Sequence, residues 1–354
     1  MKKLIFSVAL LSAALSASAE EHPLWMRYPA ISPDGTTIAF AYKGDLYSVS
    51  VNGGEARQLT THAAFDSHPV WSPDSKKIAF QSNREGSLDI FVIDAKGGAP
   101  TRLTTNSGSE TPIAFADNDH VLYSASLQPT AQSIIFGDNT FPQVYKVSTK
   151  GGRPELFSTL TMENISIAKN GDILYHDKKG YEDPWRKHQK SPIARDIWLK
   201  SNGKFAKQTT FAGEDRSPVW TSDEKSFFYL SEQDGTFNIY RRSLNSSSDK
   251  QITHHKGNPV RFLTASSTDL LCYGYDGEIY TVKEGGEPQK VNISITTDND
   301  APSLVRQIKS WGATEISVSP DAKEVAFVMH GDVYVTSVEY TTTKRITDTP
   351  QQER

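Results

Sequence analysis

A short motif, Ser-Pro-Asp, recurs along this chain, and the same pattern of short apolar runs follows each copy. The clearest copy lies between Trp71 and Thr104 and reads WSPDSKKIAFQSNREGSLDIFVIDAKGGAPTRLT. Proline fixes φ and a short polar side chain closes a turn, so Pro73-Asp74 predicts the end of a first strand. Gly97-Gly98 supplies the positive φ that a tight hairpin needs. The segment therefore predicts four short strands joined by three turns.

The third of these predicted strands, Asp89 to Asp94, is apolar on both faces. Side chains alternate along a strand, so Phe91 and Ile93 share one face while Ile90 and Val92 share the other. A strand that is apolar on both faces is not expected to lie against water on either side. The sheet must therefore be sandwiched between two neighbours.

The rest of the chain repeats this pattern and can supply those neighbours. Seven related segments are recognised, at 32–60, 72–104, 115–157, 165–210, 220–253, 270–292 and 319–347. The 14 Tyr, 16 Phe, 23 Gly and 18 Pro suit many short strands and turns. One four-stranded unit cannot bury both of its faces alone, whereas radial stacking around an axis does. The sequence therefore predicts an all-β fold, a β-propeller of four-stranded antiparallel blades, over a linear solenoid.

The spacing of the repeats bears on how many blades close the ring. Connections are short as far as residue 292, and a longer polar stretch then precedes the last repeat. We predict a six-bladed propeller over 22–292, a linker over 293–315 and, over 316–354, the first blade of a second, incomplete propeller. A single seven-bladed ring is the alternative. Because a lone blade leaves a face unburied, we expect the sequence to be truncated within a longer protein.

The first nineteen residues are typical of a targeting segment. Lys2-Lys3 is a positive start, Leu4 to Leu15 is apolar, and Ala17-Ser18-Ala19 fits a cleavage site. We predict a signal peptide over 1–19 and export to the periplasm or the extracellular space. No later run is long and apolar enough to predict a membrane span.

The overall charge bears on the class of partner, and the cysteine content bears on whether disulfides stabilise the fold. The net charge of −4 gives no reason to expect a nucleic acid partner. Cys272, the only cysteine, cannot form an internal disulfide, and its strand-like context predicts a small buried hydrophobe.

The repeat pattern P-x-W-S-P-D-G, then D-I-Y/F-V, then G-G and L-T, resembles the TolB-type, WD-like propeller repeat. Following a signal peptide, and with a break between the sixth and seventh repeats, it resembles the amino-terminal part of tricorn-type serine peptidases. The resemblance covers Trp25 to Thr347, and Gly180 to Trp198 is similar to an insertion of exported members. It implies a second propeller, a PDZ domain and catalytic domains downstream, so no catalytic residue is assigned to this chain.

Motifs of catalysis and metal binding are absent from the sequence. It contains no G-x-S-x-G, no H-E-x-x-H and no paired-cysteine spacing, so we expect no catalytic residue, cofactor or metal site here. His254 and His255 would point to opposite faces of a strand, and a solvated loop is the simpler interpretation. The Ser-Pro-Asp aspartates, Asp34, Asp74 and Asp321, recur too regularly to form a site and are interpreted as turn residues.

The better candidates for binding are loops on one rim of the ring. Connections between blades and turns between second and third strands would share that rim, and they hold His62, Asp66, His68, Arg84, Glu85, Glu110, Asp215, Arg216, Asp234 and His255. Together they could form a mixed-charge funnel for peptides, or an ordinary solvated rim.

Two insertions are further candidates. The segment 181–195 combines an aromatic residue with several basic ones, as binding hot spots do, or caps the ring as a packed excursion: Trp185, Arg186, Lys187, His188, Lys190 and Arg195. The segment Leu127 to Phe141 carries the apolar triplet Ile134-Ile135-Phe136, which indicates either a partner surface or a fold back onto its blade.

These observations together predict a non-catalytic propeller segment of an exported tricorn-like serine peptidase. It would guide or filter oligopeptides toward the peptidase domains of the same protein. The alternatives are a TolB-like periplasmic scaffold that binds proteins, and the propeller of a prolyl-oligopeptidase-type hydrolase. The sequence leaves the oligomeric state open, a homo-oligomer included.

Overall fold

The computed structural model describes residues 23–126, 141–181, 188, 190–244, 248–296, 308–340 and 342–347. Within these ranges every regular element is a β-strand, which confirms the all-β prediction. In the part of the chain so described, no helix is long and apolar enough to cross a membrane. The predicted signal peptide at 1–19, residues 127–140 of the apolar insertion, and Trp185, Arg186 and Lys187 lie outside the described residues.

Apart from one short two-stranded pair, the described strands form seven four-stranded antiparallel sheets, each built from strands in chain order as the repeats predict. Blades 1 to 3 are β1 (Arg27–Ile31), β2 (Thr37–Tyr42), β3 (Asp45–Ser50) and β5 (Arg57–Gln58); β6 (Asp66–Trp71), β7 (Lys77–Ser82), β8 (Asp89–Asp94) and β9 (Thr101–Arg102); β10 (Glu110–Asp117), β11 (His120–Ala125), β12 (Gln143–Ser148) and β13 (Glu155–Ser158). Blades 4 and 5 are β14 (Met162–Ile167), β15 (Ile173–Asp177), β16 (Ile197–Ser201) and β17 (Lys204–Lys207); β18 (Asp215–Trp220), β19 (Ser226–Ser231), β20 (Asn238–Ser243) and β21 (Asp249–Gln251). Blades 6 and 7 are β22 (Arg261–Ala265), β23 (Leu271–Tyr275), β24 (Glu278–Val282) and β25 (Gln289–Lys290); β27 (Thr314–Val318), β28 (Glu324–Met329), β29 (Asp332–Ser337) and β30 (Thr343–Arg345).

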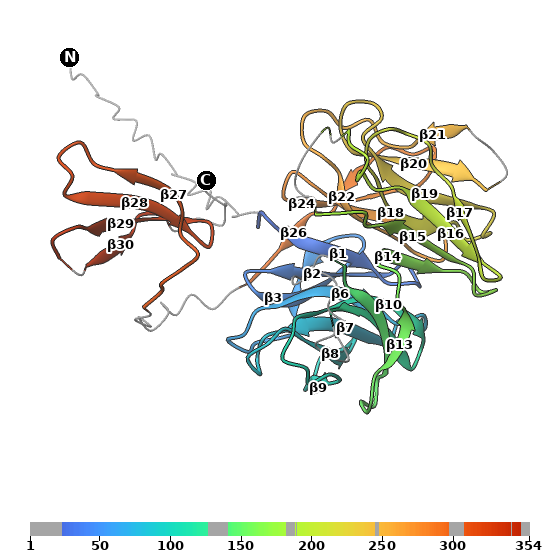
Figure 1. The fold of residues 1–354 in the computed structure, drawn as a ribbon, viewed down its shortest axis with the longest axis horizontal. Coiled ribbons are helices and arrows are strands. Elements are labelled where there is room, and N and C mark those ends of the chain that lie inside the picture. Colours follow the sequence, from blue (N-terminus) through green and yellow to red (C-terminus); the bar gives the residue numbers. More distant parts are fainter. Residues whose placement is uncertain are drawn as a thin grey trace, which may run out of the picture.

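Six of the sheets stand around a common axis (Figure 1). The first strand of each blade contacts the first strand of the next, from β1 through β6, β10, β14 and β18 to β22, and β22 returns to β1. Blade 7 pairs only within its own sheet and is drawn apart from the ring. The arrangement is thus six blades plus one, in place of the alternative single ring of seven.

Blade 2 shows why the ring holds together. Phe91 and Ile93 pack in a buried cluster with blade 1, and Ile90 and Val92 pack in another with blade 3. All four side chains are buried, and burial of such a side chain contributes about 1.5–3 kcal/mol. The prediction of a sheet sandwiched on both faces is confirmed.

The Ser-Pro-Asp motif forms the turn after the first strand. In blade 2, Ser72 Oγ donates to Asp74 Oδ1 at 2.7 Å, and the Lys76 backbone N–H donates to the same oxygen at 3.2 Å. The Ser72 hydroxyl lowers the pKa of Asp74 below its ordinary value. Asp34 and Asp321 accept the same kind of bonds, so these aspartates are turn residues as predicted.

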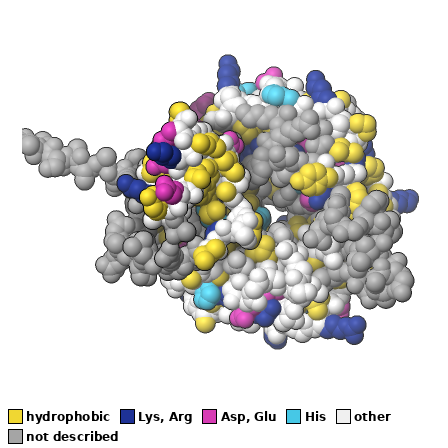
Figure 2. Space-filling view, turned by 60° about the vertical axis from the view of Figure 1, so that its left-hand side comes forward, with side chains coloured by type: hydrophobic (Ala, Val, Ile, Leu, Met, Phe, Trp, Pro, Cys, Tyr) yellow, Lys and Arg dark blue, Asp and Glu magenta, His cyan; other side chains and the backbone are white. Residues whose placement is uncertain are grey.

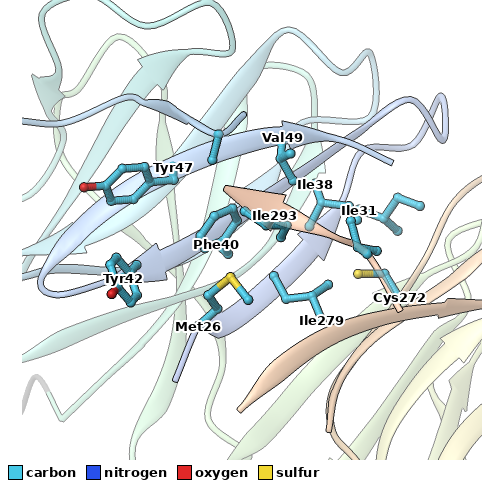
Figure 3. Close-up of a cluster of buried hydrophobic side chains, with 12 residues drawn as sticks. Met26, Ile31, Ile38, Phe40, Tyr42, Tyr47, Val49, Cys272, Ile279 and Ile293 are labelled. Carbon is cyan, nitrogen blue, oxygen red and sulfur yellow. The ribbon is translucent and has the colours of Figure 1, made fainter. Parts of the chain in front are cut away.

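The ring closes where blade 6 meets blade 1, and among the described strands none of blade 6 joins the four-stranded sheet of blade 1. A short parallel pair joins β26 (Ile293–Ser294) to β4 (Gly54–Glu55). Figure 3 shows the cluster at this seam, in which Ile293 packs with Phe40, Ile279 and Cys272. Cys272 is fully buried, as predicted. Since Ile293 is part of the seam, the ring extends two residues into the segment expected to be a linker.

Candidate functional site

The innermost strands carry a recurring bulge at the same position in five of the six ring blades. The residue at the bulge has a positive φ of 49–59°, and the five are Tyr28, His68, Asn164, Ser217 and Phe262. A bulge re-aims a side chain out of the regular pleat. Here all five residues line one central cavity of about 610 Å³.

The cavity lies along the inner strands and opens as the hollow at the centre of the disc in Figure 2. Its volume falls within the range of about 300–1,000 Å³ that is usual for ligand pockets. Each of the six ring blades contributes to its lining, so the site exists only once the ring has closed.

One side of the cavity is an aromatic wall made of Tyr28, His68 and Phe262, from blades 1, 2 and 6. The rings of Tyr28 and His68 lie 3.7 Å apart between centroids, and those of Tyr28 and Phe262 lie 4.8 Å apart. Burial lowers the pKa of His68 to about 4, so its imidazole is neutral near pH 7. The wall can therefore stack on an apolar or aromatic group.

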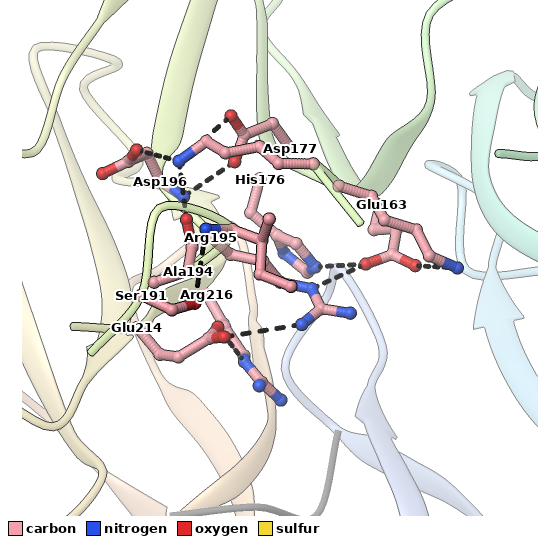
Figure 4. A network of polar contacts seen from close by, with 12 residues as sticks. Glu163, His176, Asp177, Ser191, Ala194, Arg195, Asp196, Glu214 and Arg216 are labelled. Carbon is pink, nitrogen blue, oxygen red and sulfur yellow. Dashed lines mark hydrogen bonds and ion pairs between the residues drawn. The ribbon is translucent and has the colours of Figure 1, made fainter. Parts of the chain in front are cut away.

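The opposite side is a charged wall made of Glu163, His176, Lys178, Arg195 and Arg216, from blades 4 and 5 (Figure 4). Glu163 Oε2 accepts from His176 Nε2 at 3.1 Å and from Arg195 Nε at 2.9 Å, and Lys178 Nζ lies 3.7 Å from Glu163 Oε1. Glu214 stands behind the wall. Its Oε2 accepts from Arg216 Nε at 2.7 Å, and its Oε1 lies 3.6 Å from Arg195 Nη1.

The hydrogen bonds of His176 fix which of its nitrogens carries the proton. The backbone N–H of Ser217 donates to Nδ1 at 3.1 Å, so Nε2 is the protonated nitrogen and donates to Glu163. Burial lowers the pKa of His176, which keeps the ring neutral. Both nitrogens are thereby occupied, and His176 has no free nitrogen to act as a general base.

The charges of this wall do not cancel. Burial alone would raise the pKa of Glu163, but the hydrogen bond from His176 and the charge of Arg195 outweigh it and hold that pKa below its ordinary value. Glu163 and Glu214 thus supply two negative charges against three positive charges on Lys178, Arg195 and Arg216, a balance of +1. Such a wall favours an anionic group in the cavity.

The fold places some of the predicted binding residues at the central cavity and others away from it. His68, Arg195 and Arg216 line the cavity. Arg84 does not, because its Nη2 pairs with Asp66 Oδ2 at 2.8 Å and its guanidinium lies over the ring of Phe91.

Other residues expected on an open rim are also enclosed. Asp215 is 1% exposed and Glu110 is equally buried. Asp215 begins β18, which contacts β15 and β16 of blade 4, and Glu110 begins β10, which contacts β7 and β8 of blade 2. His255 is half-buried, stacked on Tyr275 at 3.9 Å and bonded to the Tyr273 hydroxyl, so the solvated-loop interpretation was wrong for it. Among the described residues, no group of three or more His, Cys, Asp or Glu could hold a metal ion.

The basic insertion is only partly described. His188 is exposed, and its backbone N–H donates to Glu232 Oε2 at 2.6 Å. Arg195, singled out as part of this basic insertion, is 5% exposed, because it reaches back to Glu163 in the charged wall. These two residues of the insertion therefore do not belong to one surface patch.

Among the residues of the two walls, sequence reasoning missed Tyr28, Phe262, Glu163, His176 and Lys178. A signal did exist for Tyr28, because the bulge residue directly precedes a proline in Tyr28-Pro29, as it does in His68-Pro69. The other four residues carry no such mark. Only the closed ring brings them to the cavity.

A closed ring of six four-stranded blades around a lined cavity defines a β-propeller. Residues 23–288 match the family described as the tricorn protease N-terminal beta propeller domain, and the chain belongs to this family. The resemblance to tricorn-type peptidases is thereby confirmed.

Individual relatives agree with this assignment. Tricorn protease homolog 1 of Streptomyces coelicolor is 25% identical over 322 residues, which are 88% of this chain and 29% of that protein. Tricorn protease of Thermoplasma acidophilum is 24% identical over 339 residues, which are 90% of this chain and 30% of that protein. The crystal structure of the tricorn protease superposes with a TM-score of 0.67 at 20% identity, covering 92% of this chain and 31% of that one, and shows the shared fold. The chain thus spans about 30% of the length of the relatives it matches.

Proposed function

We propose that this chain is a non-catalytic propeller segment of an exported tricorn-like serine peptidase. In this proposal the ring guides or filters oligopeptides through its central cavity toward downstream catalytic domains. The observation that carries it is the opposition of two walls in one cavity, aromatic on one side and charged on the other. An oligopeptide offers both kinds of group, and aromatic and arginine side chains are the usual anchors for such ligands.

The geometry of the walls supports binding over chemistry. The aromatic wall is built of mutually packed rings, and the charged wall is held by ion pairs, so both are ordered before a ligand arrives. A preorganised site loses less conformational entropy on binding. His176, which would be the obvious base, has both nitrogens in use.

The remaining parts of the proposal concern the longer protein. Blade 7 would begin a second propeller, because Ile316 and Val318 of β27 are exposed although first strands in the ring are packed by neighbouring blades. Downstream propeller, PDZ and peptidase domains would be its partners within the same chain. Residues 1–19 would direct export to the periplasm or the extracellular space.

A blocked cavity tests the guiding role. Asn164 and Asn202 both have a φ of 49° and are exposed, but Asn164 lines the cavity whereas Asn202 lies in the outer turn between β16 and β17. Asn164→Trp should therefore fill the cavity at the same backbone cost as Asn202→Trp. The chain is incubated with a mixed pool of short peptides, and retained peptides are identified by mass spectrometry and titrated singly by calorimetry.

We expect Asn164→Trp to weaken peptide binding by at least about tenfold, or 1.4 kcal/mol, and Asn202→Trp to leave it unchanged. Both variants should unfold at the same denaturant concentration. Undiminished binding by the Asn164 variant would reject the cavity as the peptide path, and a scaffold that binds proteins at its rim would explain the chain better.

A further inference from the structure

Acidic side chains occur in pairs at three of the six contacts between ring blades. One acid of each pair lies at or next to the start of a third strand, and the other begins the first strand of the next blade. The pairs are Asp45 with Asp66, Asp89 with Glu110, and Asp196 with Asp215. The strands at these positions are in contact, β3 with β6, β8 with β10 and β16 with β18. Asp45 is half-buried, and the other five acids are buried.

The other three contacts between ring blades show that the pairs are not a property of every repeat. The corresponding residues there are Gln143 with Met162, Asn238 with Val260, and Glu278 with Met26. The three first-strand residues are apolar and buried, and Glu278 forms an ion pair with Lys290. An acid at the start of a first strand thus occurs only where the preceding blade also presents an acid.

Positive side chains reach only one acid of each pair. Arg84 Nη2 lies 2.8 Å from Asp66 Oδ2, and Arg102 Nη2 lies 2.7 Å from Asp89 Oδ2. Lys207 Nζ lies 2.8 Å from Asp196 Oδ2, which also pairs with Lys179.

The second acid of each pair is Asp45, Glu110 or Asp215, and among the described residues no ion pair reaches any of the three. The described hydrogen bonds of Asp45 come from the neutral side chains of Gln58 and Thr60. Two buried carboxylates that lie close together do not both ionise readily, because each charge is poorly solvated and repels the other. The acid without a positive partner is therefore the one expected to keep a proton.

The electrostatics of the three acids agree with this expectation. Burial raises the pKa of Glu110 to about 7, and the charge of Asp89 raises it further against the hydrogen bond from Thr104. Burial likewise raises the pKa of Asp215 to about 7 and that of Asp45 to about 6, and the other acid of each pair adds to the rise. The remaining groups that face these three acids from the packed strands are Arg84, Tyr47, Arg102, Tyr123, Thr209, Ser231, Asp249 and Tyr229.

The first-strand acids stand directly beside the central cavity in the chain. Asp66 lies two residues before His68, Glu110 one residue before Thr111, and Asp215 one residue before Arg216. His68, Thr111 and Arg216 line the cavity. A movement of the first strands at these contacts would therefore move part of the cavity lining.

We propose that the three acid pairs form a pH-sensitive device in the ring. Each contact is tight while the acid without a positive partner holds a proton, and the contacts of blades 1 with 2, 2 with 3 and 4 with 5 loosen when the proton is lost. An opened contact returns this acid to water, where it ionises near pH 4. Opening therefore becomes more favourable as the pH rises from about 4 to about 7 and changes little above. The inference goes beyond the proposed function and does not depend on peptide binding.

The test is hydrogen–deuterium exchange of the complete chain at pH 5 and pH 8, read by mass spectrometry and corrected for the intrinsic exchange rate at each pH. Amide protection in β10 and β18, which begin with Glu110 and Asp215, should fall by about thirty- to a hundredfold between the two pH values. The internal control is β23 of blade 6, since neither contact of that blade carries an acid pair. Protection of β23 should change by less than about threefold.

Matched variants assign the effect to single contacts. Glu110→Gln and Asp215→Asn resemble the protonated acids in size and hydrogen-bonding groups, so both rings should fold at either pH. Glu110→Gln should reduce the pH effect in β10 to less than about threefold and leave that in β18 unchanged, and Asp215→Asn should do the reverse. Glu155→Gln is the control, because Glu155 is an exposed acid of the same blade as Glu110. It should leave both strands as in the wild type.

Each outcome decides for or against the device. Equal losses of protection in β10, β18 and β23 would show that pH acts on unfolding of the whole ring, and the device would be rejected. A pH effect in β10 that persists in Glu110→Gln would assign it to another group and would reject the role of the pair. Neither result bears on the guiding role, which Asn164→Trp tests separately.

Discussion

The rings of Tyr28 and His68 lie with their centroids 3.7 Å apart and their planes tilted by 32°, although the two residues lie one repeat apart in the chain. They meet because each occupies the bulge of the first strand in adjacent blades, with φ of 53° and 54°. A repeat in sequence thereby becomes a circle of side chains around the axis. The lining of the central cavity therefore depends in part on what each repeat places at that single position.

Ile31 and Val318 test whether blade packing stabilises the ring and whether blade 7 lacks a neighbour. Each directly precedes a Ser-Pro-Asp turn, but Ile31 is 3% exposed and Val318 is 58% exposed. Ile31→Ala should lower the free energy of unfolding by about 2–4 kcal/mol because it opens a cavity between blades 6 and 1. Val318→Ala should change it by less than about 0.5 kcal/mol. Urea unfolding followed by tryptophan fluorescence measures the free energy of unfolding of both variants. Equal losses of stability would contradict the absence of a packed neighbour beside β27 of blade 7.

Gly53 tests the seam that closes the ring. A Cβ at Gly53 would lie 2.4 Å from the backbone oxygen of Asn292, next to the β4–β26 pair. Gly285 has nearly the same φ, +82° against +83°, but open space around it. Gly285→Ala should cost about 1–2 kcal/mol for the left-handed backbone alone. Gly53→Ala should cost about 1–3 kcal/mol more, because backbone atoms must move apart.

The readout for this pair is the midpoint of thermal unfolding at matched protein concentration. Similar midpoints for the two variants would mean that the contact between β4 and β26 does not hold the ring closed.

The raised pKa of Asp215 predicts that the stability of the fold depends on pH. Burial raises the pKa of Asp215 to about 7, above its ordinary value of about 3.9. The folded state therefore keeps a proton that the unfolded state loses near pH 4, so stability falls as pH rises from about 4 to 7 and levels off above. Asp215→Asn removes this penalty, and its stability relative to wild type should rise by about 2–3 kcal/mol between pH 5 and pH 8.

Asp34→Asn is the control for Asp215. Burial alone would raise the pKa of Asp34, but hydrogen bonds from Ser32 and Thr36 lower it, so its contribution is already complete above pH 5. Denaturant unfolding at both pH values gives the comparison. A stability difference between Asp215→Asn and wild type that does not vary with pH would show that folding does not raise the pKa of Asp215.

We predict that the thiol of Cys272 reacts slowly in the native protein. It is fully buried at the seam, and burial raises the pKa of its thiol. Because the thiolate is the reactive form, a chromogenic disulfide reagent should modify native protein at least about a hundredfold more slowly than protein in 6 M guanidinium chloride. One equivalent of rapid reaction in the native state would show that the seam opens readily.

Much of the fold was predictable because it is encoded locally and repeatedly. The turn after each first strand follows from Ser72 and Asp74 and their counterparts, and the two-sided burial of Ile90, Phe91, Val92 and Ile93 follows from their alternation. The candidate site was less predictable. His68, Arg195 and Arg216 were singled out and do line the cavity. Arg84 and Asp215 were singled out too, but they do not line it, and Asp215 is buried.

The sequence by itself determined the blades, since strand, turn and facial burial all depend on residues within one repeat. Only the tertiary structure decided the cavity. Closure of the ring brings Tyr28 against Phe262 from the far end of the propeller, and it sets both opposite the charged wall. Whether a side chain faces the axis or the next blade depends on the bulge and on the neighbouring sheet. A pattern of apolar and polar residues along one strand does not carry that information.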